Sequence, residues 1–152
     1  MIKTLTAVFA TFAAFAAAIV PAHARDAEVY TGLFSSLAVG GYDTVAYFKV
    51  NRPVKGKAEF SMQYKGATWQ FASAENLNAF RANPAAYAPQ YGGYCAFGMS
   101  EGRAVPGDPR VFTVIDGRLY LGTDADALRR WSEDVAANAA RADRNWERML
   151  EK

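Results

Sequence analysis

The stretch that decides the fold is residues 64–73, which read YKGATWQFAS. Two runs rich in aromatic and apolar side chains, 58–64 and 67–71, meet at Lys65-Gly66. A glycine in a two-residue connection between such runs is typical of a tight turn, so this spacing predicts an antiparallel β-hairpin.

A helix is predicted directly after this hairpin. Ser73 suits its N-cap, because a serine hydroxyl can accept a hydrogen bond from the first helical turn. The helix should cover about 74–82, and Asn83-Pro84 should end it and begin one further turn through Tyr87.

The segments on either side are less regular. Residues 45–50 are aromatic and β-branched, which predicts a strand, and 29–41 predicts a loop or short helix ending at Gly40-Gly41. Residues 88–109 are rich in Gly, Pro and Tyr and predict a long loop, the kind of segment on which binding residues often lie.

A second hairpin is predicted over 111–115 and 118–121, joined by Asp116-Gly117. Thr123, with Asp126 three residues later, resembles a capping box and predicts the start of a C-terminal helix.

That helix should be amphipathic, with a bend near 136–140 and its charged side chains in solvent. We detect no internal repeat, and hairpins mixed with helices favour an α+β fold. The apolar positions recur at three- and four-residue steps: Leu128, Trp131, Val135, Ala139, Ala142, Trp146 and Met149.

Residues 1–24 are typical of a secretory signal peptide. Lys3 is followed by an uncharged run over 4–20 and then by Ala22-His23-Ala24, which predicts cleavage after Ala24. The expected mature protein is a single domain over 25–152 in the periplasm or outside the cell, without stable membrane insertion. A retained transmembrane anchor is the alternative, since the run is almost long enough to span a bilayer.

The composition excludes several classes of function. The 152 residues include 17 basic and 15 acidic side chains, which gives no excess of positive charge for nucleic acid. The one histidine, His23, would leave with the signal peptide, so histidine-based nucleophilic catalysis is not expected. One cysteine excludes an internal disulfide framework.

Several motifs together resemble the YHS domain. Residues 64–73 are followed by Phe80 and by NPAAY at 83–87, and GYDTVAYF at 41–48 stands where that family carries D-P-V-C-G-M. A wider pattern resembles exported YHS-domain proteins of bacteria. It comprises YGGYCA at 91–96, DGRLYL at 116–121 and the terminal Ala142-Asp143 and Asn145-Trp146.

The resemblance implies a YHS-like fold of short hairpins and a short helix, extended by the second hairpin and the C-terminal helix. YHS domains that bind metal do so through cysteines, and the corresponding positions here are Ala46, Ala72 and Asn76. Alanine has no donor atom and a single amide is a weak ligand, so we expect that the family's metal site is lost.

Cys95 is the candidate reactive thiol, and it could pair with another thiol or bind a soft ion such as Cu(I). Met99, with Met62, could add thioether ligands to a copper site. The alternative is that Cys95 is a small buried apolar residue and that the methionines fill the core.

A ligand pocket could form from aromatic walls and one carboxylate. The alternative is that the same rings fill the core, with the carboxylate stabilising a turn. The candidate ligand-binding residues are Tyr42, Asp43, Tyr47, Trp69, Tyr91 and Tyr94.

These observations favour a non-catalytic binding module for a small ligand, a metal species or a periplasmic partner protein. The alternatives are a single-cysteine redox protein that uses Cys95 and a copper-binding protein that uses Cys95 and Met99. The sequence requires no cofactor, and copper is the one that it could accommodate.

Overall fold

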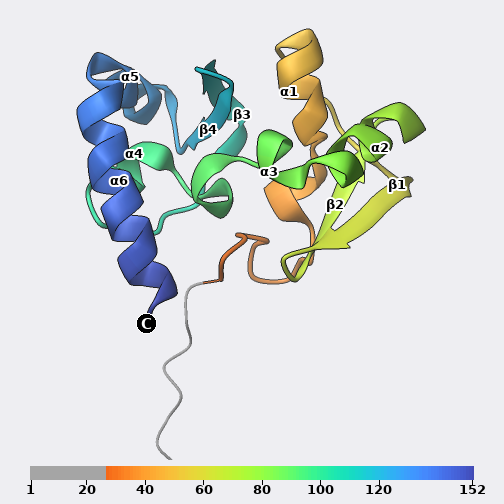
Figure 1. Ribbon diagram of the computed structural model, residues 1–152, viewed down its shortest axis with the longest axis horizontal. Coiled ribbons are helices and arrows are strands. Elements are labelled where there is room, and N and C mark those ends of the chain that lie inside the picture. Colours follow the sequence, from red (N-terminus) through yellow and green to blue (C-terminus); the bar gives the residue numbers. More distant parts are fainter. Residues whose placement is uncertain (1–26) are drawn as a thin grey trace, which may run out of the picture.

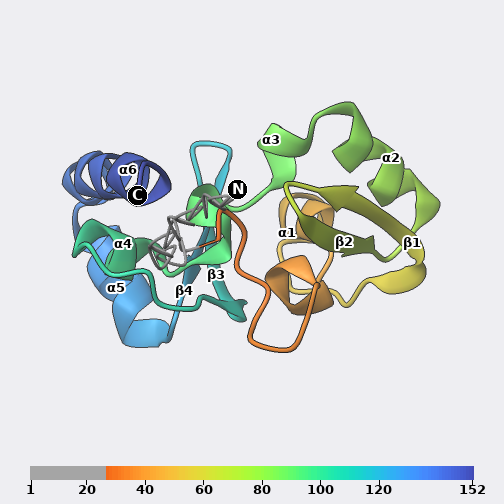
Figure 2. The same ribbon diagram turned by 90° about the horizontal axis from the view of Figure 1, so that it is seen from below.

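The computed structural model describes residues 27–152, so the expected signal peptide and its cleavage site lie outside the described residues. The chain forms two lobes that lie side by side, with the green segment around residues 84–93 running between them (Figure 1). The view from below shows the same division (Figure 2). Helices and two antiparallel hairpins make up the fold, which confirms the α+β prediction.

Lobe one, residues 38–87, contains the predicted first hairpin and the helix after it. Ser73 caps this helix by accepting a hydrogen bond from the amide of Asn76 at 3.2 Å, as expected. Its elements are the 3₁₀ turn η1 (Ala38–Gly41), α1 (Thr44–Val50), β1 (Lys57–Tyr64), β2 (Ala67–Phe71), α2 (Ala74–Ala82) and α3 (Pro84–Tyr87).

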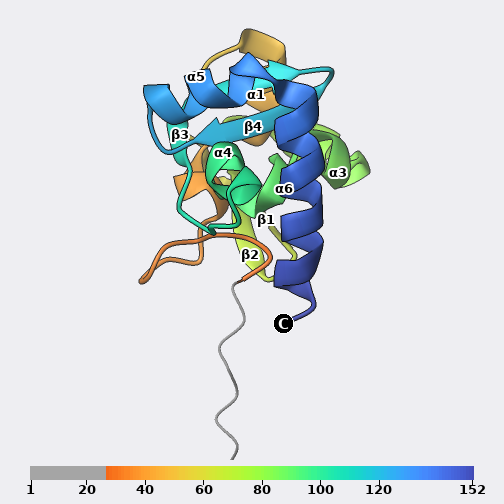
Figure 3. The ribbon, with the colours of Figure 1, turned by 90° about the vertical axis from the view of Figure 1, so that its left-hand side faces the viewer.

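Lobe two, residues 90–150, contains the second hairpin and the C-terminal helices, of which α6 runs alongside α4 and α5 (Figure 3). None of the described helices is long and apolar enough to cross a membrane. The elements of this lobe are the 3₁₀ turn η2 (Gln90–Gly93), α4 (Ala96–Ser100), β3 (Asp108–Ile115), β4 (Arg118–Gly122), α5 (Ala125–Glu133) and α6 (Val135–Leu150).

The prediction of a strand over 45–50 is wrong, because these residues form helix α1. The cause is the residue before the helix. Asp43 is its N-cap, and its Oδ1 accepts hydrogen bonds from the amides of Val45 at 2.9 Å and Ala46 at 3.2 Å. These bonds satisfy two amides of the first turn, which outweighs the β preference of the side chains. The segment 88–109, predicted as a loop, likewise contains η2 and α4.

The C-terminal helix also differs from its prediction. Its N-cap is Asp124, which accepts from the amide of Ala127 at 2.8 Å, whereas the Thr123 hydroxyl donates to the Pro106 carbonyl. The helix breaks at Asp134, earlier than the bend expected at 136–140.

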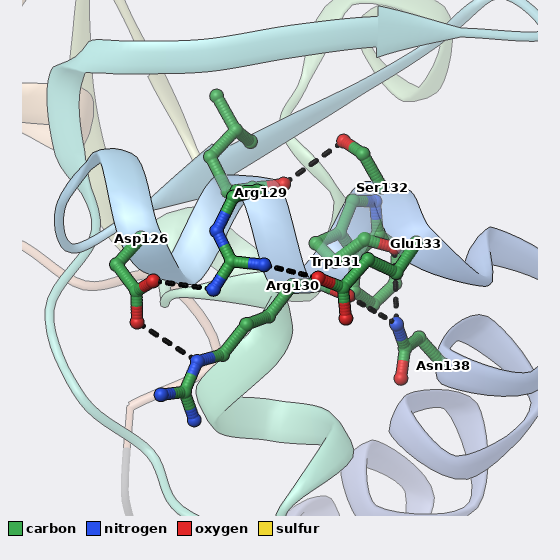
Figure 4. A network of polar contacts seen from close by, with 8 residues as sticks. Asp126, Arg129, Arg130, Trp131, Ser132, Glu133 and Asn138 are labelled. Atoms are coloured by element: carbon green, nitrogen blue, oxygen red, sulfur yellow. Dashed lines mark hydrogen bonds and ion pairs between the residues drawn. The ribbon is translucent and has the colours of Figure 1, made fainter.

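Figure 4 shows how the break between α5 and α6 is held. The Nδ2 of Asn138 donates to the carbonyls of Arg130 and Trp131, both at 3.0 Å. On the outer face of α5, Asp126 pairs with Arg129 and Arg130, as the predicted solvated face requires. Such exposed pairs add little to stability.

The two lobes share one backbone arrangement, beginning with the 3₁₀ turns. Val39 (φ 51°, ψ 33°) and Gly40 (φ 58°, ψ 23°) lie in the left-handed region in η1. Tyr91 (φ 59°, ψ 33°) and Gly92 (φ 61°, ψ 16°) have nearly the same angles in η2. Both turns carry the sequence Gly-Gly-Tyr, at 40–42 and 92–94.

The correspondence continues through the rest of both lobes. Each turn leads into a capped helix, and each hairpin has one irregularity in its register. The helices α2 and α5 both begin at a side-chain cap, Ser73 or Asp124. They end at Asn83 (φ −153°, ψ 77°) and Asp134 (φ −152°, ψ 79°). Residues 38–150 therefore repeat one arrangement of elements, a repetition that the sequence analysis did not detect.

The buried apolar residues form two clusters, and the one centred in lobe one also includes Leu119 and Leu121 of lobe two. Trp69 and Phe80 lie at the centre of the first, with ring centroids 5.0 Å apart, and Trp131 and Tyr120 lie in the second, 4.8 Å apart. The lobes also contact each other directly. The hydroxyl of Tyr47 in lobe one donates to the carbonyl of Pro109 in lobe two at 2.7 Å.

Candidate functional site

A hollow of about 230 Å³ lies where the two lobes meet. It brings together Trp69 of lobe one and Tyr91 of lobe two, two of the six residues predicted to bind a ligand. The other lining residues are Glu28, Val29, Tyr64, Lys65, Ala85, Ala88, Pro89, Gln90, Gly92 and Trp146.

The aromatic walls are fixed by hydrogen bonds. The indole Nε1 of Trp69 donates to the carbonyl of Tyr64 at 2.9 Å. On the other side, the hydroxyl of Tyr91 donates to Asp143 at 2.8 Å, and its ring lies 6.1 Å from that of Trp146. Burial, and then the hydrogen bond to Asp143, raise the pKa of Tyr91, so it remains a phenol and a donor.

The rim of the hollow carries an ion pair. Lys65, in the turn between β1 and β2, pairs with Glu28 from the segment that precedes lobe one. The hydrogen bond to Glu28 raises the pKa of Lys65. Each side chain is 43% exposed, so the pair remains open to solvent and to ligands.

The floor depends on Gly92. A Cβ added to this residue would lie 1.9 Å from the carbonyl oxygen of Glu28 and 3.2 Å from the ring of Trp146. The Gly92 carbonyl accepts from the amide of Tyr30 at 2.9 Å, so two backbones pass in direct contact. A side chain here would displace the segment that carries Glu28.

The other predicted ligand residues lie elsewhere. Tyr47 is buried in the lobe-one core, and Tyr42 lies under the ammonium group of Lys55, 4.2 Å from the ring centroid. Tyr94 packs its ring against Tyr30 and Trp146. These residues therefore do not form one pocket with Trp69 and Tyr91.

Asp43 is fully buried and its carboxyl group joins three segments of lobe one. Besides the two amides of α1, it accepts from the amide of Ala72 at 2.8 Å and from the Nδ2 of Asn76 at 2.7 Å, both through Oδ2. Four donors therefore surround one side chain, as a buried carboxylate requires.

Three of the four donors around Asp43 come from residues 46, 72 and 76, the positions at which the YHS resemblance places metal-binding cysteines. Ala46 and Ala72 offer only backbone amides there, and Asn76 points its amide hydrogens at the carboxylate. Nowhere within residues 27–152 do three His, Cys, Asp or Glu side chains gather closely enough to hold a metal. At residues 46, 72 and 76 the side chains present do not supply the cysteine ligands that the resemblance implies.

Cys95 occupies in lobe two the position that Asp43 has in lobe one. It is 2% exposed and caps α4, with its Sγ 3.4 Å from the amide of Gly98. A second hollow of about 340 Å³ borders it, with Arg103 and Arg130 among the lining residues.

The methionines proposed as partners of Cys95 lie in different cores. Met99 is buried in lobe two, one helical turn after Cys95, and its amide donates to the Cys95 carbonyl. Met62 packs against the core of lobe one. The backbone of Met99 therefore contacts that of Cys95, whereas Met62 lies in the other lobe.

Comparison with known families identifies lobe one. Residues 45–91 match the family model of the YHS domain, a family to which metal binding is attributed. The chain contains a YHS domain. The match runs from α1 to η2 and so covers the Asp43 contacts at residues 46, 72 and 76. No curated protein and no solved structure matches the chain.

Sequence reasoning missed most of the residues that line the hollow between the lobes. It assigned Lys65 to a turn and Trp146 to the apolar stripe of a helix, it gave Glu28 no role in a site, and it placed Gly92 only within the loop 88–109 on which binding residues were expected. The repeated Gly-Gly-Tyr sequence was the available signal for Gly92, because it marks the same left-handed turn in both lobes.

Proposed function

We propose that this chain is an exported, non-catalytic YHS-domain protein that binds a small organic molecule in the hollow between its lobes. The observation that carries the proposal is the hollow itself, which is lined by aromatic side chains from both lobes and by one ion pair. Ligand sites commonly combine apolar and aromatic walls with a few polar groups that fix the ligand's orientation.

The lining residues support binding rather than catalysis. The phenol of Tyr91 and the indole of Trp69 are each committed to a structural hydrogen bond. The chain's one histidine is His23, in the predicted signal peptide. The amine of Lys65 is held in its protonated form, because the hydrogen bond to Glu28 raises its pKa, so the hollow offers orientation and contact area rather than an activated nucleophile.

We further propose that lobe one keeps the YHS fold without the family's cysteine metal site. The carboxylate of Asp43 supports this, because it links residues 46, 72 and 76 through hydrogen bonds. Metal analysis of the purified protein checks the proposal. Stoichiometric zinc or copper that Asp43→Ala or Asn76→Ala removes would contradict it.

NMR spectroscopy with a library of small organic fragments tests the binding proposal. Fragments should shift the amide signals of residues 64–69 and 90–92, and Ala88→Phe, which places a ring in the hollow, should abolish those shifts. Ala136→Phe, on the exposed face of α6, is the matched control and should change nothing. Fragment shifts that survive Ala88→Phe, or an absence of fragment binding, would refute the proposed site.

Export has its own test. The mature protein recovered from the periplasm or medium should begin at Arg25, as N-terminal sequencing would show. Retention in the inner membrane with residues 1–24 still attached would favour the anchored alternative.

A second candidate function is thiol redox chemistry or copper binding at Cys95 with Met99. The hollow beside the sulfur, with two arginines in its lining, favours it. Alkylation of the folded protein distinguishes the two functions. Labelling of Cys95 that needs denaturant would exclude this second function, and rapid labelling of the native protein, increasing with pH, would support it.

A further inference from the structure

The charges in the hollow indicate what kind of molecule it takes. Among the described residues that line it, Glu28 and Lys65 are the only two that carry a charge, and they pair with each other. The equivalent turn of lobe two carries Asp116 in place of Lys65, so this pair is a feature of the hollow and not of the repeated fold.

We infer that the ligand is a compact zwitterion of the α-amino acid class, whose carboxylate binds Lys65 and whose ammonium group binds Glu28. This inference rests on the proposed function. A ligand that enters between the two side chains separates them, and it can satisfy both only if it carries both charges. A singly charged ligand would pair with one side chain and leave the other to water alone.

The walls suit the rest of such a molecule. Tyr64 and Trp69 on one side, and Tyr91 and Trp146 on the other, offer ring surface to an aliphatic side chain and to an ammonium group. The Lys65 ammonium group already lies 5.7 Å from the centroid of the Tyr64 ring. A bound ammonium group could use the same kind of contact.

The size of the hollow limits the ligand. At about 230 Å³ it is smaller than the roughly 300–1,000 Å³ typical of sites for drug-sized molecules. A single amino acid fits this volume better than a peptide does. The ion pair is exposed at the rim, so the charged end should lie outward and the side chain inward.

Titration calorimetry with three related compounds tests the inference. L-leucine carries both charges, L-leucinamide carries only the positive one and N-acetyl-L-leucine only the negative one. We expect L-leucine to bind at least tenfold more tightly than either derivative. Lys65→Met and Glu28→Gln should each weaken L-leucine binding about tenfold or more, with circular dichroism confirming that both variants fold.

The pair Lys49–Glu75, 2.8 Å apart on the surface of lobe one, supplies the matched control. Lys49→Met and Glu75→Gln should leave the affinity unchanged. If a derivative binds the hollow as tightly as L-leucine, the zwitterion inference is wrong while the proposed site stands. If L-leucine does not bind but neutral fragments shift the hollow's signals, only the inference fails. If nothing binds there, both fail.

Discussion

The two lobes use one backbone arrangement and hold it in different ways. In lobe one, α1 is tied to the hairpin and to α2 by the buried carboxylate of Asp43. In lobe two, Cys95 stands at that position and makes one weak sulfur contact. In this lobe the long helix α6 holds α4 in place, because Asn145 of α6 donates hydrogen bonds to the carbonyls of Met99 and Ser100 at the end of α4. The comparison shows that the helix after the Gly-Gly-Tyr turn can be held either by a buried carboxylate or by hydrogen bonds from a further helix.

The largest difference between the lobes should appear when these two caps are removed. Asp43→Ala leaves four buried or half-buried donors without their acceptor, which should cost about 3 kcal/mol or more of unfolding free energy. Cys95→Ala removes one small side chain and should cost about 1–2 kcal/mol. Urea unfolding of both variants makes the comparison, and equal losses would contradict the role given to Asp43.

The next contrast concerns two equivalent glycines. Gly40→Ala meets its nearest neighbour at 3.5 Å and should cost only the left-handed strain of about 1–2 kcal/mol. Gly92→Ala adds a clash with the Glu28 carbonyl, so its cost should reach about 3 kcal/mol and the ion pair should move. Thermal unfolding measures the costs, and ligand titration reports the hollow. Equal behaviour of the two variants would show that the close contact is unimportant.

A smaller effect is expected one helical turn into α2 and α5. Asn76→Ala copies the residue of lobe two into lobe one and removes a hydrogen bond to Asp43, at a cost of about 1–2 kcal/mol. Ala127→Asn makes the reverse exchange in a lobe that has Cys95 in place of Asp43, and should stay within about 0.5 kcal/mol of the parent protein. Denaturant midpoints of the two variants measure these costs. A larger loss of stability from Ala127→Asn than from Asn76→Ala would contradict the role given to Asn76.

The smallest effect should be seen at alkaline pH. Burial raises the pKa of Tyr47 and, together with the hydrogen bond to Asp143, that of Tyr91, above the value of about 10 expected in the unfolded chain. Their contribution to stability is therefore complete below about pH 10 and decreases above it, because the unfolded chain releases these protons first. Tyr47→Phe and Tyr91→Phe should each flatten the fall in unfolding free energy between pH 9 and 11. If the unfolding free energy of these variants falls with pH as steeply as that of the parent protein, the two tyrosines do not cause the loss of stability.

Local signals predicted much of the fold. The turns at Lys65-Gly66 and Asp116-Gly117 and the cap at Ser73 were identified because each depends on a few neighbouring residues. Helix α1 was missed because the β-branched and aromatic residues of 45–50 were given more weight than the N-cap that Asp43 supplies. The helix break at Asp134 was misplaced for a related reason, since apolar periodicity continues through it.

The candidate site was much harder to predict. Trp69 and Tyr91 were recognised as ligand candidates, but their partners Glu28 and Trp146 come from distant parts of the sequence. Which aromatic residues face a hollow and which fill a core depends on the packing of the two lobes, and no local pattern records that packing. The repeat itself was hidden because its equivalent residues differ chemically, as at Asp43 and Cys95.

The close contact between the backbone of Gly92 and the segment that carries Glu28 limits how much of the proposed site can be moved to another protein. The YHS match ends at Tyr91, so a fragment cut at that border would carry Lys65, Trp69 and Tyr91 but neither Glu28 nor the ring of Trp146. Grafting the family unit into another protein would therefore transfer the scaffold without the complete proposed site.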